Sequence, residues 1–127
     1  MARAILGTGV DLQRIADMER AVRHHGERFL GRVFTPEEVA DCRSRLRSDQ
    51  SLAARFAAKE AFRKALGGSP GIPWHDIEVR RTQGAPTLFL HGAAQKVAQR
   101  RGVQRIHLSL SHSGDYAIAM VVIEGEP

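Results

Sequence analysis

The chain has 127 residues, of which 43% are hydrophobic and 26% charged, an ordinary balance for one globular domain spanning residues 1–127. It contains no run of about 18 apolar residues that could cross a bilayer and begins without the apolar segment of a secretion signal, so we expect a soluble, cytoplasmic protein. The formal net charge of +5 favours an anionic partner, which by charge alone can be nucleic acid, a phosphorylated small molecule or an acidic protein.

The first predicted element is a strand over residues 4–12, where apolar side chains alternate along the chain. Gly7 and Gly9 leave room in this strand for another backbone to come close, and Asp11 lies near the strand's end. A carboxylate in that place can bind a hard cation such as Mg²⁺, which takes oxygen ligands. The alternative is an aspartate that only caps the following turn.

Two helices are expected next. The first covers residues 16–25 and is followed by a loop, and the second begins after Thr35, whose spacing to Glu38 matches a capping box. Cys42 lies in the second helix as the only cysteine, which excludes an intrachain disulfide and a cysteine-based metal site. We expect Cys42 to be half-buried, as such residues often are.

The segment from Arg55 to Leu66 predicts a long helix that ends at the glycine-rich turn 67–71. Ser48 or Ser51 is the expected N-cap. One arc of this helix carries side chains small enough to let another backbone come close: Ala54, Ala58, Ala61 and Ala65.

Glu60 and Lys64 lie one turn apart on one face of the same helix. In a functional interpretation, Glu60 is a metal ligand and Lys64 a counter-charge for phosphate. The alternative is a simple helical ion pair, worth about 0.2–0.5 kcal/mol.

Beyond Pro73 the pattern changes from helical to alternating, which is typical of strands. The expected elements are a hairpin over 76–80 and 87–91, a short helix over 93–101, and two strands within 106–123. The final strand, over 116–123, is apolar on both faces, so it is central in a sheet or buried in a subunit contact.

A polar cluster closes the first of the last two strands. Alternation leaves His112 at the strand end, between the hydroxyls of Ser111 and Ser113. An imidazole with hydroxyls suits a phosphate group, whereas the alternative is an ordinary polar turn. A serine nucleophile is disfavoured because no Gly-x-Ser-x-Gly elbow is present.

Taken in order and spacing, these clusters resemble the holo-acyl-carrier-protein synthases, the small bacterial members of the 4′-phosphopantetheinyl transferase superfamily. The resemblance covers essentially the whole chain. The residues that carry it are Gly9-Val10-Asp11, the run Arg55 to Ala61 with Lys64, Gly84-Ala85-Pro86, and the run Ser109 to Ser113.

The resemblance implies an α+β fold, with a mostly antiparallel sheet packed around a long central helix. It implies an enzyme that transfers the phosphopantetheine arm of coenzyme A to a serine of apo acyl carrier protein and releases adenosine 3′,5′-bisphosphate. Mg²⁺, for which Mn²⁺ is a conceivable substitute, would be held by Asp11 and Glu60. Glu60, directly or through a water, would take the serine proton, and Lys64 would contact the pyrophosphate.

The same resemblance implies a second group of coenzyme A contacts. His112, with Ser111 and Arg55, would bind phosphate at the nucleotide end, and Gly84 and Pro86 would line the adenine side. Larger relatives carry two copies of this unit with the site between them. This chain is therefore expected to form a homotrimer, with Asp11, Glu60 and Lys64 of one copy facing His112 of the next.

One position departs from the family pattern. The family usually has an arginine six residues after the metal-binding aspartate, where it helps to recruit the carrier protein, and this chain has Asp17 there. An acidic carrier protein would instead dock on Arg14, Arg20 and Arg23 of the first helix. The sequence leaves open whether this carrier protein belongs to fatty-acid or to polyketide synthesis.

Two other classes of protein stay open. A non-catalytic scaffold could keep the fold and bind coenzyme A or a carrier protein. A small basic nucleic-acid-binding module would use the same charge, but aromatic residues make up only 6% of the chain and no stacking motif is present.

Overall fold

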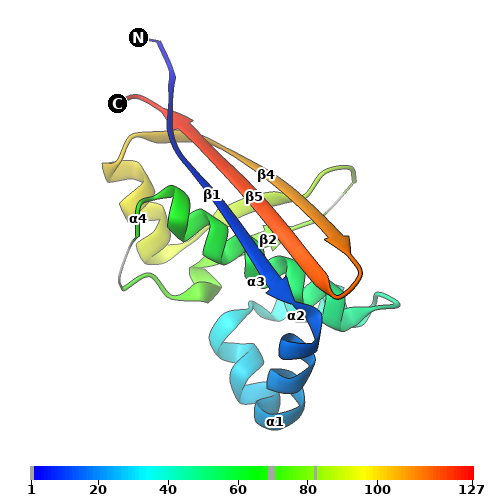
Figure 1. Ribbon diagram of the computed structural model, residues 1–127. Coiled ribbons are helices and arrows are strands. Elements are labelled where there is room, and N and C mark those ends of the chain that lie inside the picture. The colour runs from blue at the N-terminus through cyan, green and yellow to red at the C-terminus, as the bar shows by residue number, and fades with distance from the viewer. Residues whose placement is uncertain (1, 69–70, 82) are drawn as a thin grey trace.

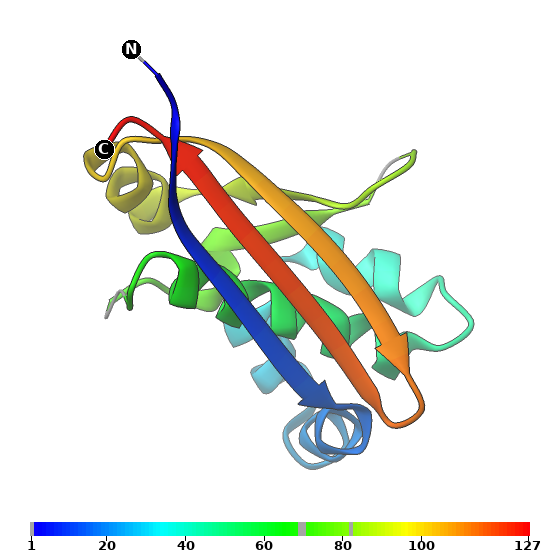
Figure 2. The same ribbon diagram turned by 45° about the horizontal axis from the view of Figure 1, so that its top comes forward.

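A three-stranded antiparallel sheet lies along one side of helix α3 (Ser48–Ala65), as Figures 1 and 2 show. The strand order is β1 (Ala4–Arg14), β5 (Tyr116–Gly125) and β4 (Val103–Ser113), so the two ends of the chain pair with each other. The computed structural model describes residues 2–68, 71–81 and 83–127. The predicted α+β class and antiparallel pairing are confirmed.

β1 approaches α3 closely because it carries glycine where the two backbones meet. A Cβ atom at Gly7 would lie 2.0 Å from the carbonyl oxygen of Ala65, and one at Gly9 would lie 1.9 Å from that of Ala61. No side chain fits at such distances. The sequence predicts close backbone approach at both segments, and the structure shows that they meet each other.

Helix α1 (Ile15–Val33) is longer than the sequence predicts. The loop expected after residue 25 is instead a kink at Gly26, which has φ 55° and ψ −137°, and the helix then continues to Val33. Glycine tolerates this left-handed φ because it has no Cβ atom. The predicted end of the first helix is therefore wrong.

The helix starts at α2 and α3 differ from each other. α2 (Pro36–Arg43) begins with the predicted capping box, in which the Thr35 hydroxyl accepts from the Glu38 N–H and the Glu38 carboxylate accepts from the Thr35 N–H. The predicted serine cap of α3 is wrong, since Ser48 is the first helical residue and the cap position is Arg47. At the other end, Gly67 with φ 80° turns the chain away, and the Ser69 and Pro70 part of that predicted turn lies outside the described residues.

A second, two-stranded sheet forms the predicted hairpin. Its strands are β2 (Ile77–Arg80) and β3 (Thr87–Leu90), with Val79 opposite Leu88. The expected first residue of β2, Asp76, instead closes the 3₁₀ turn η1 (Trp74–Asp76). Its carboxylate accepts from the Ala93 N–H, at 2.9 Å, in the first turn of α4 (Gly92–Arg100).

β5 is apolar on both faces, as predicted, and the two faces have different surroundings. The inner side chains are buried: Ala117, Ala119, Val121 and Ile123. On the opposite face of the three-stranded sheet, four large apolar side chains are between 37% and 57% exposed. They are Val10 and Leu12 of β1 with Ile118 and Met120 of β5, and they are called the outer apolar face below.

The buried residues form two hydrophobic clusters, one between α3 and the sheets and one where α1 and α2 meet α3. Cys42 belongs to the second cluster and is fully buried rather than half-buried, because helix α3 covers it with the side chain of Arg55. In the part of the chain that the structure describes, no helix has the length and apolar character needed to cross a membrane.

Candidate functional site

Asp11 lies on the inner face of β1, where its carboxylate meets α3. Its Oδ1 accepts from Lys64 Nζ at 3.0 Å, and its Oδ2 accepts from Gln13 Nε2 at 2.5 Å. Lys64 also donates to the carbonyl oxygen of Val10 at 3.0 Å. The side chain of Asp11 is only 11% exposed, whereas that of Lys64 is 55% exposed. Lys64 is therefore paired with Asp11, and not with Glu60 as the helical alternative would have it.

Glu60 is half-buried and faces Trp74 instead. Its Oε1 accepts from the indole Nε1 of Trp74 at 2.7 Å, and the described residues supply no hydrogen bond to Oε2. The indole ring lies near two other side chains of α3, Phe56 and Arg63. The carboxylate thus has one oxygen held by the protein and one that is open.

Two carboxylates and a lysine are suited to a hard cation with a phosphate. Asp11 and Glu60 offer carboxylate oxygens as metal ligands. Each carboxylate oxygen can accept more than one contact, so Asp11 can bind a cation while it also contacts Lys64. The described residues contain no cluster of three or more metal-ligating side chains. A pair of carboxylates still fits Mg²⁺, which keeps several waters and phosphate oxygens as its other ligands.

His112 and Ser111 lie at the far end of β4 and border a hollow of about 460 Å³. Three arginines face the same hollow: Arg45, Arg47 and Arg81. Arg45 also bonds the Asp41 carboxylate, at 3.1 Å from Nη2 to Oδ2. With three guanidinium groups, this surface is suited to an anion of high charge.

The sequence reasoning missed these three arginines. For two of them the sequence holds a signal, because every second residue from Arg43 to Arg47 is an arginine. Arg81 follows β2 in the hairpin that contains Gly84 and Pro86, so the residues predicted for the adenine side belong to an element that reaches the hollow. Gly84 is exposed, with φ 88°.

Arg55 is not in this hollow. Its guanidinium is 2% exposed and donates to the carbonyl oxygen of Glu38 at 2.9 Å, to Cys42 Sγ at 3.1 Å and to the Asp41 carboxylate. Burial raises the pKa of the Cys42 thiol to about 11. In the single chain, Arg55 therefore joins α2 to α3. Its guanidinium donates to groups of α2, which does not favour its predicted role in phosphate binding.

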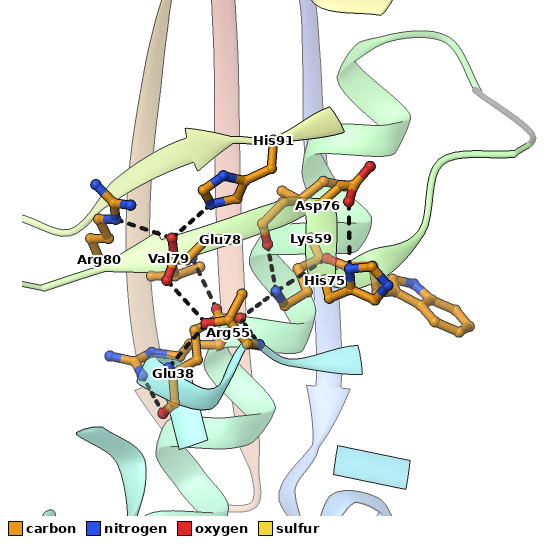
Figure 3. Close-up of polar contacts among 12 residues, drawn as sticks. Glu38, Arg55, Lys59, His75, Asp76, Glu78, Val79, Arg80 and His91 are labelled. Carbon is orange, nitrogen blue, oxygen red and sulfur yellow. Dashed lines mark hydrogen bonds and ion pairs between the residues drawn. The ribbon is translucent and has the colours of Figure 1, made fainter. Parts of the chain in front are cut away.

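A buried ionic network, drawn in Figure 3, includes Lys59, the residue that precedes Glu60 in α3. Lys59 Nζ is 2.7 Å from Glu38 Oε1 and also donates to the carbonyl oxygen of Ile77, while Glu38 Oε2 accepts from the Val79 N–H at 2.9 Å. Burial lowers the pKa of Lys59, and the attraction of the Glu38 carboxylate opposes that shift. Lys59 and Glu38 tie α3 to α2 and β2 at the residue that precedes Glu60.

The first helix places its arginines next to acids. Arg20 Nη1 is 3.2 Å from Asp17 Oδ1, and Arg23 Nη1 is 3.3 Å from the Glu19 carboxylate. Arg14 donates to the Tyr116 hydroxyl at 3.2 Å. Asp17, at the position where the family usually has arginine, therefore partly neutralises one of the three predicted docking residues.

The structure thus brings together Asp11 and Lys64, places Glu60 one helical turn away, and puts His112 with Ser111 in a separate hollow. Trp74 contacts Glu60, and the sequence reasoning missed this contact because the chain must turn back after α3 to bring residue 74 to residue 60. Trp74 follows Pro73 and belongs to no periodic pattern that indicates a contact with Glu60.

Comparison with protein families matches residues 7–121 to the 4′-phosphopantetheinyl transferase superfamily. A holo-[acyl-carrier-protein] synthase from Koribacter versatilis is 46% identical over 123 residues, which cover 94% of this chain and 98% of that protein. The crystal structure of holo-[acyl-carrier-protein] synthase from Neisseria meningitidis has a TM-score of 0.87 and 33% identity, covering 94% of this chain and 98% of its own.

The enzyme of the same name from Helicobacter pylori, in complex with coenzyme A, has a TM-score of 0.80 and 31% identity and covers 91% of this chain and 98% of its own. These likenesses extend over nearly all of both chains, and they confirm the family that the motifs predict. The chain belongs to the 4′-phosphopantetheinyl transferase superfamily.

Proposed function

We propose that this chain is a holo-[acyl-carrier-protein] synthase, an enzyme that transfers the 4′-phosphopantetheine arm of coenzyme A to a serine of an apo acyl carrier protein. Relatives that are 46% and 48% identical over nearly the whole chain carry that name, and one similar structure holds coenzyme A. In this structure the proposal is supported most directly by the contact of Asp11 with Lys64, close to Glu60.

Asp11 and Glu60 would hold Mg²⁺, which when bound neutralises charge on the phosphate under attack and on the departing nucleotide. The serine oxygen forms a bond to the phosphorus that carries pantetheine, the pyrophosphate bond to the nucleotide breaks, and adenosine 3′,5′-bisphosphate leaves. Glu60 is our candidate to accept the serine proton, directly or through a water. Lys64 would move from Asp11 to a pyrophosphate oxygen, since its half-exposed side chain is free to turn.

The nucleotide end of coenzyme A would occupy the hollow at His112 and Ser111. Support comes from the arginines that face it, because the 3′-phosphate adds charge to an already anionic ligand. Gly84 and Pro86 would line the adenine side, and Arg55 would act at a distance by fixing α2.

A complete site would need a second copy of the chain. His112 lines a hollow that Asp11 does not line, and the outer apolar face leaves four large apolar side chains exposed. A homotrimer would cover this face and set His112 of one copy opposite Asp11 of the next. The acidic carrier protein would dock on Arg14, Arg20 and Arg23 beside this shared site.

Mass spectrometry of a carrier protein tests the activity directly. Incubation with coenzyme A, Mg²⁺ and an apo carrier protein should add the mass of the transferred arm. Asp11→Ala and Glu60→Ala should reduce the rate at least about 100-fold by removing charge-stabilising ligands, whereas Glu27→Ala, an acid on α1 outside the site, should act like the wild type.

The alternatives give different results in the same experiment. No mass gain with several carrier proteins, despite coenzyme A binding, would favour the scaffold. Near-normal rates in both Asp11→Ala and Glu60→Ala would refute the metal assignment. His112→Ala should mainly weaken coenzyme A binding, and an unchanged affinity would instead make His112 part of a turn.

A further inference from the structure

The only tryptophan of the chain, Trp74, is held against α3 at two points. Its indole Nε1 donates to Glu60 Oε1 at 2.7 Å, and its backbone carbonyl accepts from Lys59 Nζ at 3.2 Å. Lys59 and Glu60 are consecutive residues. One dipeptide of α3 therefore binds both the main chain and the side chain of Trp74.

The direction of the indole N–H is fixed by its surroundings. The ring centroid of Phe56 is 5.8 Å from that of Trp74, and the Arg63 guanidinium carbon is 4.9 Å from the indole centroid, within range of a cation–π contact. Lys59, which holds the Trp74 carbonyl, is itself 0% exposed and paired with Glu38 (Figure 3). The indole consequently has little freedom to turn away from Glu60.

This arrangement assigns different roles to the two oxygens of Glu60. Oε1 is engaged by the indole, and Oε2 receives no hydrogen bond from the described residues. A hydrogen bond to one oxygen of a ligating carboxylate holds its rotamer and directs the other oxygen to the metal. We propose that Trp74 is a positioning residue, which orients Glu60 so that Oε2 is presented to the divalent cation. This inference rests on the proposed function, in which Glu60 is a metal ligand.

The proposal predicts a loss of metal affinity when the N–H donor alone is removed. Partners that orient metal ligands typically contribute a factor of 10 to 100 in affinity, so we expect about a tenfold weaker binding of Mn²⁺. Coenzyme A binding without metal should not change, because Trp74 contacts neither the hollow at His112 nor Lys64.

The experiment measures free Mn²⁺ by electron paramagnetic resonance during titration of the full-length protein with coenzyme A present. Trp74→Phe removes the donor and shortens the ring. Because the chain has one tryptophan, biosynthetic incorporation of benzothienylalanine replaces only residue 74 and exchanges N–H for sulfur while keeping the two-ring shape. Phe56→Leu is the matched control: it reduces ring packing and keeps the donor, so it should lose much less Mn²⁺ affinity than Trp74→Phe.

Glu60→Gln separates failure of this inference from failure of the proposed function. If Glu60→Gln weakens Mn²⁺ binding but the benzothienylalanine protein binds like the wild type, the role of Trp74 is overturned and the metal assignment stands. If Glu60→Gln binds Mn²⁺ normally, the metal assignment falls and the inference falls with it. In the Glu60→Gln background, Trp74→Phe should cause no further loss of affinity.

Packing effects are recognised in the same set. Thermal unfolding should show the benzothienylalanine protein at or slightly below the wild-type temperature, because one hydrogen bond is lost while the two-ring shape is kept. A loss of Mn²⁺ affinity in Phe56→Leu equal to that in Trp74→Phe would show that ring packing, rather than the hydrogen bond, supports Glu60, and would overturn the proposal.

Discussion

Lys59 and Glu38 form a pair of opposite charges that are both fully buried, 2.7 Å apart. Desolvation of two charges largely offsets their attraction, so such a pair is weak evidence for net stability and is better understood as fixing geometry. Lys59 reaches two carbonyl oxygens of the segment before and within β2, those of Trp74 and Ile77. The residue that follows Lys59 is Glu60, so the buried pair fixes the backbone from which the candidate ligand projects.

Glu78 makes stability depend on pH. Burial alone would raise its pKa, but hydrogen bonds from His91, Thr35 and Arg80 hold the pKa of Glu78 below its ordinary value of 4.5. A carboxyl group whose pKa is lowered in the folded state stabilises that state above the unfolded pKa and loses this contribution as the pH falls through the folded pKa.

Glu78→Gln should therefore lower the unfolding temperature at pH 7, and the difference from the wild type should shrink as the pH falls below about 4.5. Thermal unfolding followed by circular dichroism between pH 7 and about pH 3 measures both proteins in the same buffers. A difference that stays constant over this range would contradict a lowered pKa of Glu78.

The contact between β1 and α3 sets the distance from Asp11 to Lys64. A methyl group at Gly9 would overlap the Ala61 carbonyl oxygen, at 1.9 Å, and backbone cannot move aside as a flexible side chain can. Gly9→Ala should therefore destabilise the protein by about 1–3 kcal/mol, the usual cost of overpacking. It should also reduce transfer more than stability explains, since β1 must move away from α3.

Gly31→Ala is the matched control for this change. Among the described residues, a Cβ atom at Gly31 would meet nothing within 4 Å, and Gly31 lies near the end of α1, where alanine favours the helix. Denaturant unfolding should show Gly31→Ala to be neutral or stabilising. If Gly9→Ala unfolded like Gly31→Ala, the close approach of β1 and α3 would be refuted.

The surface of α1 should respond to its departure from the family pattern. Asp17 lies 3.2 Å from Arg20 on an exposed surface, where it competes with any acidic partner. Asp17→Ala should lower the KM for an acidic carrier protein about two- to fivefold with little change in kcat, because rim charges act mainly on encounter. Glu27→Ala makes the same charge change farther along α1, and an equal effect there would show that net charge, not Arg20, is responsible.

Local sequence patterns predicted several elements, because the interactions that form these elements join residues close together in the sequence. The Thr35 and Glu38 capping box and the β2–β3 hairpin are of this kind. The continuation of α1 past Gly26 could not be predicted, since it depends on the burial of Leu30 and Val33 against other helices.

The same distinction applies to the candidate site. Asp11, Glu60 and Lys64 were predicted from motifs, but the contact of Asp11 with Lys64 joins residues 53 positions apart. The family resemblance implies a phosphate-binding role for Arg55, whereas its burial against Cys42 follows from how α2 packs on α3. Long-range packing decides such partners, and a single sequence does not display it.

The molecule as a single copy exposes an apolar strip that a soluble monomer rarely keeps. Met120 lies at the middle of the outer apolar face, opposite Val10 on one side and Ser109 on the other, and is 51% exposed. Burial of this strip between copies would remove apolar area from water. The proposed homotrimer therefore has a driving force that does not depend on substrate.

Met120→Arg should dissociate the assembly and abolish transfer together, because the charge would be buried in the contact. Sedimentation velocity measures the assembly, and the mass gain of the carrier protein measures the activity. Gln95→Arg, on the exposed surface of α4, adds the same charge elsewhere and should change neither. A stable, fully active monomeric wild type would refute the homotrimer.

The position of Trp74 has a practical consequence for kinetic work. As the only indole in the chain, it supplies nearly all of the intrinsic fluorescence above 300 nm, and it touches Glu60. Its emission should change when a cation binds at Glu60, without any added label. Stopped-flow mixing can then follow the arrival of the cation in real time, separately from transfer of the arm.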